Sequence, residues 1–239
     1  MKRLMLLLVI VFSAVLSLDA RDIYIFSVGV SDYPGTGHDL TFPAKDAKAM
    51  IRLYRQQGSQ HTYLLTDNNA TRSTILANAR KLFKNAKADD IVVFFFSGHG
   101  YPGGFCAYDE YLTYQDVKSV FAQCKSQNKM IFADACFAGE FRGKTVRKTR
   151  DKLTKSVMLF LSSRDDEVSY DGDSSMNNGI FTACLLSGLK GGADLNRDRV
   201  ITARELFVAV SQGVHKLTRD EQHPVMWGKF DNNMPVMVW

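Results

Sequence analysis

The feature that most constrains the fold of this chain is the alternation of two kinds of apolar pattern. Short runs rich in β-branched and aromatic residues recur at residues 22–30, 61–66, 90–96, 129–134 and 156–163. Between them lie segments with the helical period of about 3.6 residues, at residues 42–57, 71–84, 113–124, 179–189 and 203–216. Such alternation is typical of a parallel sheet covered by helices on both faces. We therefore expect an α/β fold, a three-layer α/β/α sandwich with a mainly parallel central sheet.

The N-terminus has the pattern of an export signal. Two basic residues precede an uncharged apolar run from Leu4 to Val15, and small residues follow as far as Ala20. The run is shorter than the roughly 20 residues needed to cross a bilayer. We therefore favour a cleaved signal peptide over residues 1–20, with an uncleaved anchor as the alternative, and no stable membrane span after cleavage. The mature domain, residues 21–239, is then expected in the periplasm or secreted.

Charge is spread unevenly along the chain. The net charge is +5, but residues 141–155 hold seven Lys or Arg against one Asp, and residues 1–20 add a further +1. The remaining body is therefore slightly acidic, which argues against a nucleic-acid partner, because such a partner needs basic residues over one folded face. The basic stretch cannot bury itself and is expected to be an exposed loop open to proteases.

The four cysteines show no metal-binding spacing. None of them falls in a CxxC pattern, so the sequence has no zinc signature. Export permits disulfides, and Cys106 with Cys124 is a candidate pair. Cys184 lies in an apolar helical segment and is expected in the core.

Two polar motifs follow directly on central strands. Residues 97–100 read Ser-Gly-His-Gly after the third predicted strand, and residues 134–139 read Asp-Ala-Cys-Phe-Ala-Gly after the fourth. Both therefore lie at the carboxyl ends of strands, where open α/β sheets place their sites. A lone His or Cys there is more often structural, but together they indicate a catalytic pair. Cys136 would be the nucleophile and His99 its general acid and base.

Neighbouring groups add to this pair. The backbone N–H groups of Gly100 and Cys136 can point at a developing oxyanion. In an extended chain, side chains two apart share a face, so Ser97 is expected beside His99 and Asp134 beside Cys136. A carboxylate next to a thiol hinders thiolate formation unless a cation is present. The obvious cation is part of the substrate.

These motifs resemble the caspase-like cysteine peptidases of clan CD, and among them the metacaspases and their bacterial relatives. The resemblance covers about residues 22–225. In that family a Ser-Gly-His-Gly element supplies the catalytic histidine, here His99, and an Asp-Ser-Cys-x-x-Gly element supplies the nucleophile, here Cys136. The resemblance implies the caspase-haemoglobinase-like fold and protein or peptide substrates. Ala135 and Phe137 depart from the family pattern, which leaves the finer substrate preference open.

The resemblance also implies a substrate pocket. Metacaspases hold a basic side chain with three residues that correspond here to Asp46, Ser97 and Asp134. Caspases instead carry Gln-Ala-Cys-x-Gly and an Arg-lined pocket for aspartate, and this chain has Asp where they have Gln. The expected function is therefore an exported cysteine endopeptidase that cleaves after Arg or Lys.

The same resemblance implies that the basic stretch is a processing site, because many such enzymes are cut between a large and a small portion. We expect a zymogen with a large-subunit-like part at residues 21–140, a linker at 141–155 and a small-subunit-like part at 156–239. The candidate self-processing residues are Arg142, Lys144, Arg147, Lys148, Arg150, Lys152 and Lys155.

A second group of oxygen-bearing side chains precedes the last helix. Asp194, Asn196, Asp198 and Glu205 occupy positions 1, 3, 5 and 12 of an EF-hand-like loop. Arg199 departs from that pattern, since the loop normally has Gly there. The alternative is a polar turn that caps the following helix. No cofactor is expected to be required, and calcium is a candidate ligand.

Two other functional classes remain open at this point. The first is a catalytically silent scaffold on the same fold, although such a protein would be expected to have a damaged Cys or His motif. The second is another cysteine hydrolase, such as an amidase or a transpeptidase. The sequence is silent on the oligomeric state.

Overall fold

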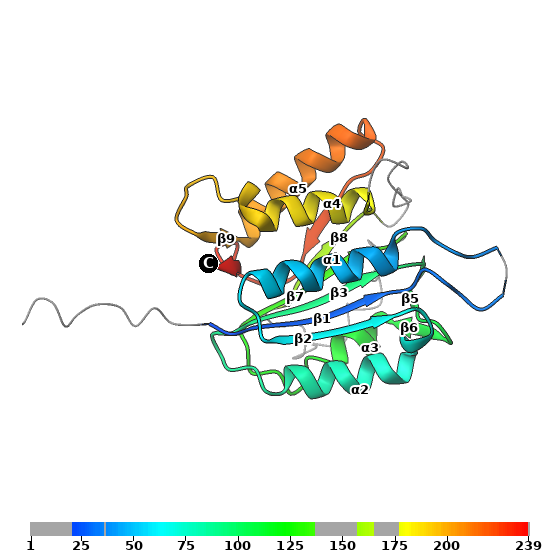
Figure 1. The fold of residues 1–239 in the computed structure, drawn as a ribbon. Helices are drawn as coiled ribbons and strands as arrows, with labels where there is room; N and C mark the ends of the chain where they lie inside the picture. The colour runs from blue at the N-terminus through cyan, green and yellow to red at the C-terminus, as the bar shows by residue number, and fades with distance from the viewer. Residues whose placement is uncertain (1–20, 36, 137–156, 165–176, 239) are drawn as a thin grey trace, which may run out of the picture.

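A six-stranded sheet forms the centre of the molecule. The computed structural model describes residues 21–35, 37–136, 157–164 and 177–238. The strands lie in the order β10-β8-β7-β3-β1-β2, and all are parallel except β10, which runs antiparallel to β8 (Figure 1). Their bounds are β1 Ile23–Gly29, β2 His61–Thr66, β3 Ile91–Ser97, β7 Asn128–Asp134, β8 Val157–Leu161 and β10 Val225–Trp227.

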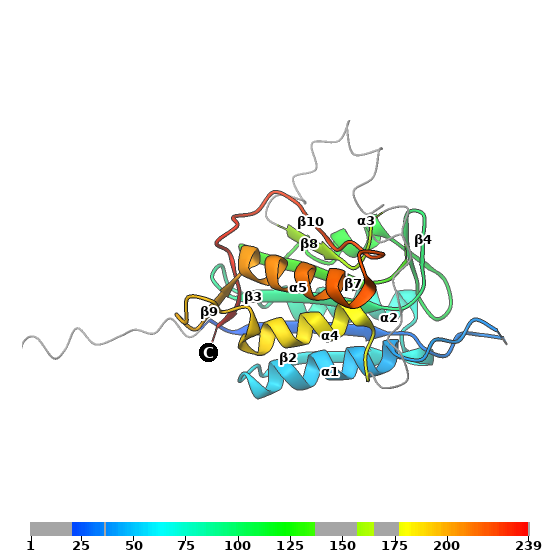
Figure 2. The ribbon, with the colours of Figure 1, turned by 90° about the horizontal axis from the view of Figure 1, so that it is seen from above.

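Helices cover both faces of this sheet, which confirms the three-layer arrangement. Three helices lie on one face, α1 (Pro43–Gln56), α4 (Ile180–Ser187) and α5 (Ala203–Thr218). Two lie on the other, α2 (Arg72–Phe83) and α3 (Tyr114–Ser119). Figures 1 and 2 show the two layers and the sheet between them. We call these the α1/α4 face and the α2/α3 face.

The central strands are apolar on both sides because each face is covered. In β3, Val93 and Phe95 pack into the core of the α1/α4 face, while Phe94 and Phe96 pack into that of the α2/α3 face. Continuous apolar strands of this kind belong in the middle of a parallel sheet. The register sets Ser97, the last residue of β3, beside Asp134, the last residue of β7.

Smaller elements complete the fold. A three-stranded antiparallel sheet follows β3, a two-stranded sheet lies near the C-terminus, and two short helical turns occur. Their bounds are β4 Gly100–Tyr101, β5 Gly104–Cys106, β6 Tyr111–Thr113, β9 Val200–Thr202, β11 Pro235–Val238, η1 Asp67–Asn69 and η5 Gly188–Gly192.

One helix is shorter than its sequence pattern predicted. The helix expected over residues 113–124 ends at Ser119, although the capping pair of Thr113 and Asp116 begins it as a full capping box. Beyond Ser119 the backbone continues in tight turns, with Val120 and Phe121 donating to carbonyls three residues back. These turns still direct Val120 and Phe121 into the core, so the apolar spacing is satisfied without a longer helix.

Three of the sequence-based predictions lie outside the described residues: the signal peptide at 1–20, the basic linker at 141–155 and Phe137. Within the described part of the chain, no helix combines the length and hydropathy required to span a bilayer.

Candidate active site

The two polar motifs meet at the carboxyl edge of the sheet. Besides the strand pairing, the Gly98 N–H donates to the carbonyl of Asp134 at 3.2 Å. Gly100 lies so close to the main chain of Cys136 that an added methyl group would collide with the Cys136 carbonyl. Only glycine allows this approach. The residue after His99 is thus packed directly against Cys136, which is itself half-buried.

His99 is held from two sides by the loop that follows β1. The Tyr33 hydroxyl accepts the His99 backbone N–H at 2.9 Å and donates to the Cys106 carbonyl at 3.2 Å. The Tyr33 ring also lies 4.9 Å from the imidazole, centroid to centroid. His99 Nε2 lies 2.8 Å from the carbonyl oxygen of His38. A carbonyl only accepts, so Nε2 must carry the hydrogen, and in a neutral ring Nδ1 is left as the base.

The loop that carries Tyr33 and His38 is itself tied to the scaffold. Asp67 accepts the backbone N–H groups of Ser31 and Asp32 at 2.9 and 3.2 Å. Across the loop, the Tyr33 N–H donates to Asp39 at 3.1 Å and the Leu40 N–H to the Ser31 carbonyl at 2.8 Å. These bonds fix the position from which His99 is held.

Ser97 and His99 do not share their surroundings, contrary to the expected alternation. Ser97 is buried and its hydroxyl donates to Asp46, whereas the His99 ring packs on Tyr33. The reason is Gly98, whose φ of +154° ends the extended strand and turns the chain. Ser97 thus lies with Asp46, its role in substrate binding stays a prediction, and its expected pairing with His99 is wrong.

Asp46 is the most deeply buried of the three residues Asp46, Ser97 and Asp134, which we call the acidic pocket. It lies in the first turn of α1 and is only 1% exposed. Its Oδ2 accepts from Ser97 Oγ at 2.9 Å, and its Oδ1 accepts from Asn178 Nδ2 at 2.8 Å and from the Gly179 N–H at 3.2 Å. All three partners are neutral. They orient the carboxylate but do not neutralise its charge.

Asp134 approaches the same place from β7. Its Oδ2 accepts from the Thr182 hydroxyl at 2.7 Å and from the Thr182 N–H at 3.1 Å. A methyl group built on Gly179 would lie 2.8 Å from Asp134 Oδ2 and 3.5 Å from Asp46 Oδ2. The two carboxylates therefore converge beside a residue that has no side chain.

Two buried carboxylates placed together are electrostatically costly. Burial raises the pKa of the Asp46 carboxyl to about 8, and the nearby charge of Asp134 acts in the same direction. The hydrogen bonds from its neutral partners lower the pKa but do not overcome burial. A cation placed between the two carboxylates would reverse the balance, because it favours the ionised form of both.

The sequence motifs did not identify every residue that builds the pocket. Asn178, Gly179 and Thr182 come from the start of α4, more than 40 residues beyond Asp134, and Tyr33 comes from the loop after β1. The sequence signal for this part of the site is Gly179, directly before an apolar helix, because a residue without a side chain leaves room for two carboxylates.

The cysteines other than Cys136 are free thiols. All four are free, so Cys106 and Cys124 do not form the candidate disulfide. Cys184 packs against the core of the α1/α4 face, as expected. Burial, and to a smaller extent the charge of Asp134, raises the pKa of the Cys184 thiol to about 11.

The EF-hand-like loop uses its oxygens internally. Asp194 accepts the backbone N–H groups of Asp198 and Arg199 at 3.2 and 3.1 Å, and Asp198 accepts that of Val200 at 2.8 Å. Arg199 takes a φ of 66°, the left-handed conformation for which this loop normally uses Gly.

Glu205 lies apart from this turn. It forms a capping box with Thr202 at the start of α5, with both Thr202 donors within 3.0 Å of its carboxylate. Among the described residues, no three His, Cys, Asp or Glu side chains are grouped so as to hold a metal ion. Calcium binding through Asp194, Asn196, Asp198 and Glu205 stays a prediction.

Comparison with known proteins agrees with this geometry. The model of the caspase domain family, peptidase family C14, matches residues 26–233. A solved protein from Geobacter sulfurreducens, GSU0716, has a TM-score of 0.69 at 18% identity and covers 91% of this chain and 99% of its own. Caspase-1 from Spodoptera frugiperda has a TM-score of 0.65 at 13% identity, over 89% and 88% of the two chains. No curated protein matched the sequence.

The chain therefore belongs to the caspase domain family. The resemblance of its motifs to caspase-like cysteine peptidases is confirmed, and so is the α/β caspase-haemoglobinase fold. Membership of this family places the chain among cysteine peptidases and implies protein substrates.

Proposed function

We propose that this protein is an exported cysteine endopeptidase of the metacaspase type that cleaves after Arg or Lys. The observation that carries the specificity is the convergence of Asp46 and Asp134 beside Gly179. The Asp46 carboxylate is buried, and its hydrogen-bond partners among the described residues are all neutral. A guanidinium or ammonium group would supply the missing charge.

The catalytic pair in this proposal is Cys136 and His99. With Nε2–H donated to the His38 carbonyl, His99 Nδ1 takes the proton of the Cys136 thiol. The thiolate attacks the carbonyl carbon after the basic residue, and the N–H groups of Gly100 and Cys136 are the expected donors to the oxyanion. The imidazolium then protonates the leaving amine, and the C–N bond breaks. Water, deprotonated by His99, hydrolyses the remaining thioester.

Peptidase assays with fluorogenic substrates test the mechanism. Substrates with Arg, Lys or Asp before the cleaved bond would be compared for wild type, Cys136→Ala and His99→Ala, with Cys124→Ala as the matched control. Because nucleophile and base act as a unit, each catalytic variant should lose about 10³-fold or more in kcat while staying folded by circular dichroism. Wild-type activity in Cys136→Ala would refute the nucleophile, and preference for Asp would refute the pocket.

Self-processing is the second part of the proposal. The chain between the ends of β7 and β8 contains the seven basic residues at 142–155 that would suit the pocket. After a cut there, β7 and β8 would remain neighbours in the sheet, since five residue pairs register them. Purified wild type should therefore appear as two associated fragments, and Cys136→Ala as one chain. Cleavage of Cys136→Ala at the same bonds without added protease would contradict self-processing.

Export is the third part, and it rests on residues 1–20. N-terminal sequencing of the mature protein from the periplasm or the medium should begin near Arg21. A protein that keeps Met1 and remains with the cytoplasmic fraction would contradict it.

A further inference from the structure

A second hollow adjoins the candidate active site on the side away from the acidic pocket. It has a volume of about 560 Å³ and is lined by Pro34 and residues 106–111. Both lining segments touch His99. Pro34 follows Tyr33, whose ring packs on the imidazole, and the Cys106 N–H donates to the His99 carbonyl at 2.9 Å. The hollow thus includes one direct partner of His99, Cys106, and Pro34, the residue after another partner, Tyr33.

The position of this hollow indicates which end of a bound peptide would lie over it. The acidic pocket belongs to the α1/α4 face, since Asp46 lies on α1 and Asp134 is held by α4. Tyr33, Ala107 and Tyr108 instead pack with the core of the α2/α3 face. A peptide with its basic side chain in the acidic pocket crosses the edge of the sheet at Cys136. Its leaving amine must reach His99, so the residues after the cleaved bond continue towards the α2/α3 face.

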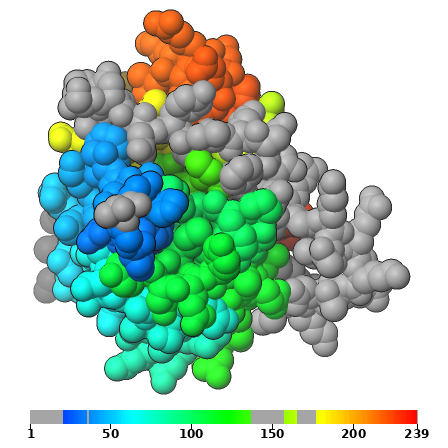
Figure 3. Space-filling model, turned by 90° about the vertical axis from the view of Figure 1, so that its right-hand side faces the viewer, coloured from blue at the N-terminus to red at the C-terminus, as the bar shows by residue number. Residues whose placement is uncertain are grey.

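Figure 3 views this edge of the molecule. The loop after β1, in blue, lies against the green segment that contains the three-stranded sheet. The hollow is lined by these two segments.

The rim of the hollow is acidic and aromatic. Asp109 and Glu110 are exposed there, and Tyr111 is 65% exposed with its ring 4.3 Å from that of Tyr101. A carboxylate beside an aromatic face suits a cationic side chain, whose charge is attracted by both.

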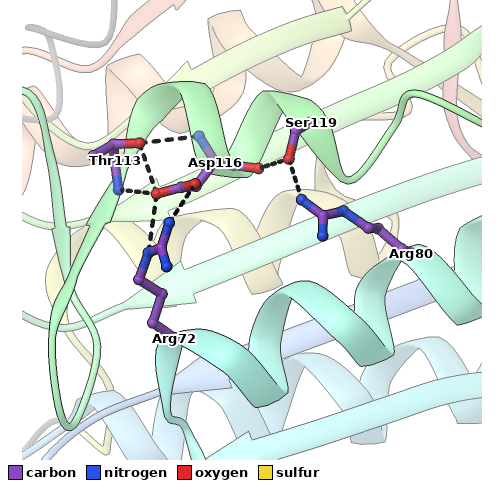
Figure 4. Close-up of polar contacts among 5 residues, drawn as sticks. All are labelled: Arg72, Arg80, Thr113, Asp116 and Ser119. Carbon is purple, nitrogen blue, oxygen red and sulfur yellow. Dashed lines mark hydrogen bonds and ion pairs between the residues drawn. The ribbon is translucent and has the colours of Figure 1, made fainter.

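Arg72, whose backbone N–H bonds to Asp109 of this rim, has its side chain engaged elsewhere. The Arg72 guanidinium binds Asp116 through Nε at 3.2 Å and Nη2 at 2.8 Å (Figure 4). Asp116 is in turn held by Thr113. Asp109 accepts the backbone N–H of Arg72 at 2.8 Å. The guanidinium of Arg72 is therefore directed at Asp116, and within the described part of the chain the Glu110 carboxylate forms no hydrogen bond or ion pair.

We infer that this hollow is a subsite for the residues that follow the cleaved bond, and that it selects a Lys or Arg side chain through Glu110 and Tyr111. The inference rests on the proposed peptidase function and extends it from one side of the cleaved bond to the other. The substrate class is then a peptide with basic residues on both sides of the bond.

Paired substrates test the inference. One peptide ends in Arg with an aminocoumarin leaving group, and the other continues after Arg with two residues that are Lys, Ala or Glu. The measured quantity is the ratio of kcat/KM for the extended peptide to that for the aminocoumarin peptide. In wild type this ratio should be about tenfold higher for Lys than for Glu. Glu110→Lys should abolish or reverse the preference, and Tyr111→Ala should weaken it, whereas Asp89→Lys, an exposed acid at the opposite edge, should retain it.

A binding measurement separates failure of the subsite from failure of the peptidase. Fluorescence anisotropy with labelled Lys-extended and Arg-terminated peptides would be recorded on Cys136→Ala and on Cys136→Ala/Glu110→Lys. The second variant should bind the extended peptide about tenfold more weakly relative to the terminated one. Equal relative affinities would overturn the subsite even if cleavage is observed. The expected loss would support the subsite even if no cleavage is observed.

Discussion

Asp46 and Asp134 form one acidic group of this molecule, and Asp194 and Asp198 form another in very different surroundings. The first pair is buried at the edge of the central sheet, where burial raises the pKa of Asp46 to about 8. The second pair lies on a surface loop, where adjacent backbone N–H groups satisfy the carboxylates. Acidic residues in water carry their charge at little cost, whereas buried ones need a counter-charge. The comparison teaches that burial, rather than the number of acids, marks the site that requires a cation.

The largest effect should come from removing the charge of Asp46. In Asp46→Asn, the KM for Arg peptides should rise by roughly two to three orders of magnitude, because breaking a buried ion pair costs roughly 3–5 kcal/mol. Asn retains the shape and can still bond to Ser97 and Asn178. Asp198→Asn is the matched control and should leave KM within about twofold. Similar effects of the two substitutions would remove the distinction between the groups.

The next effect concerns pH. Because burial raises the pKa of Asp46 to about 8, a cationic side chain that binds below this pH must displace the Asp46 proton. Peptide affinity for Cys136→Ala should therefore increase about tenfold per pH unit as the pH rises towards 8, and then level off. The guanidinium of the peptide stays charged throughout. Anisotropy titrations of Cys136→Ala from pH 6 to 9 measure this affinity, and an affinity that does not change with pH would contradict the prediction. Adding Asp46→Asn, which cannot ionise, should remove the pH dependence.

A smaller effect should appear in stability. The pKa of Asp46 is raised on folding, so the folded state binds more protons than the unfolded state between about pH 4 and 8. Its contribution thus lowers stability as the pH rises through this window. Asp46→Asn mimics the protonated acid and should match wild type at pH 5 but melt a few degrees higher at pH 9. Thermal unfolding at the two pH values measures the difference, and an equal difference at both would exclude Asp46 as its source.

The smallest effect should be that of calcium on the surface loop. Calcium at about fourfold its Kd would stabilise the fold by about 1 kcal/mol, which corresponds to a rise in Tm of about 2–4 °C. The effect should vanish in Asp194→Asn/Asp198→Asn, while Asp46→Asn should retain it. Calorimetry that detects no binding at millimolar calcium would limit the loop to its structural role as the turn before α5.

Some residues of the site could be predicted from local sequence, and others could not. Ser97 and Asp134 end their strands, and His99 and Cys136 lie two residues further on, so the sheet register brings all four to one edge. Tyr33 and Asn178 follow no such rule. They belong to loops whose course depends on which helices they join, and Asp67 and Asp46 fix them through contacts between distant segments.

For the fold, the periodicity of the sequence by itself determined the five parallel strands, their helices and the three layers, because burial on two faces requires that pattern. The Cys and His motifs by themselves indicated the family. Only the tertiary structure decided the end of α3 at Ser119, the separation of Ser97 from His99 by the turn at Gly98, and the convergence of Asp46 and Asp134 at Gly179. These features depend on contacts between residues far apart in the chain, which local apolar patterns do not encode.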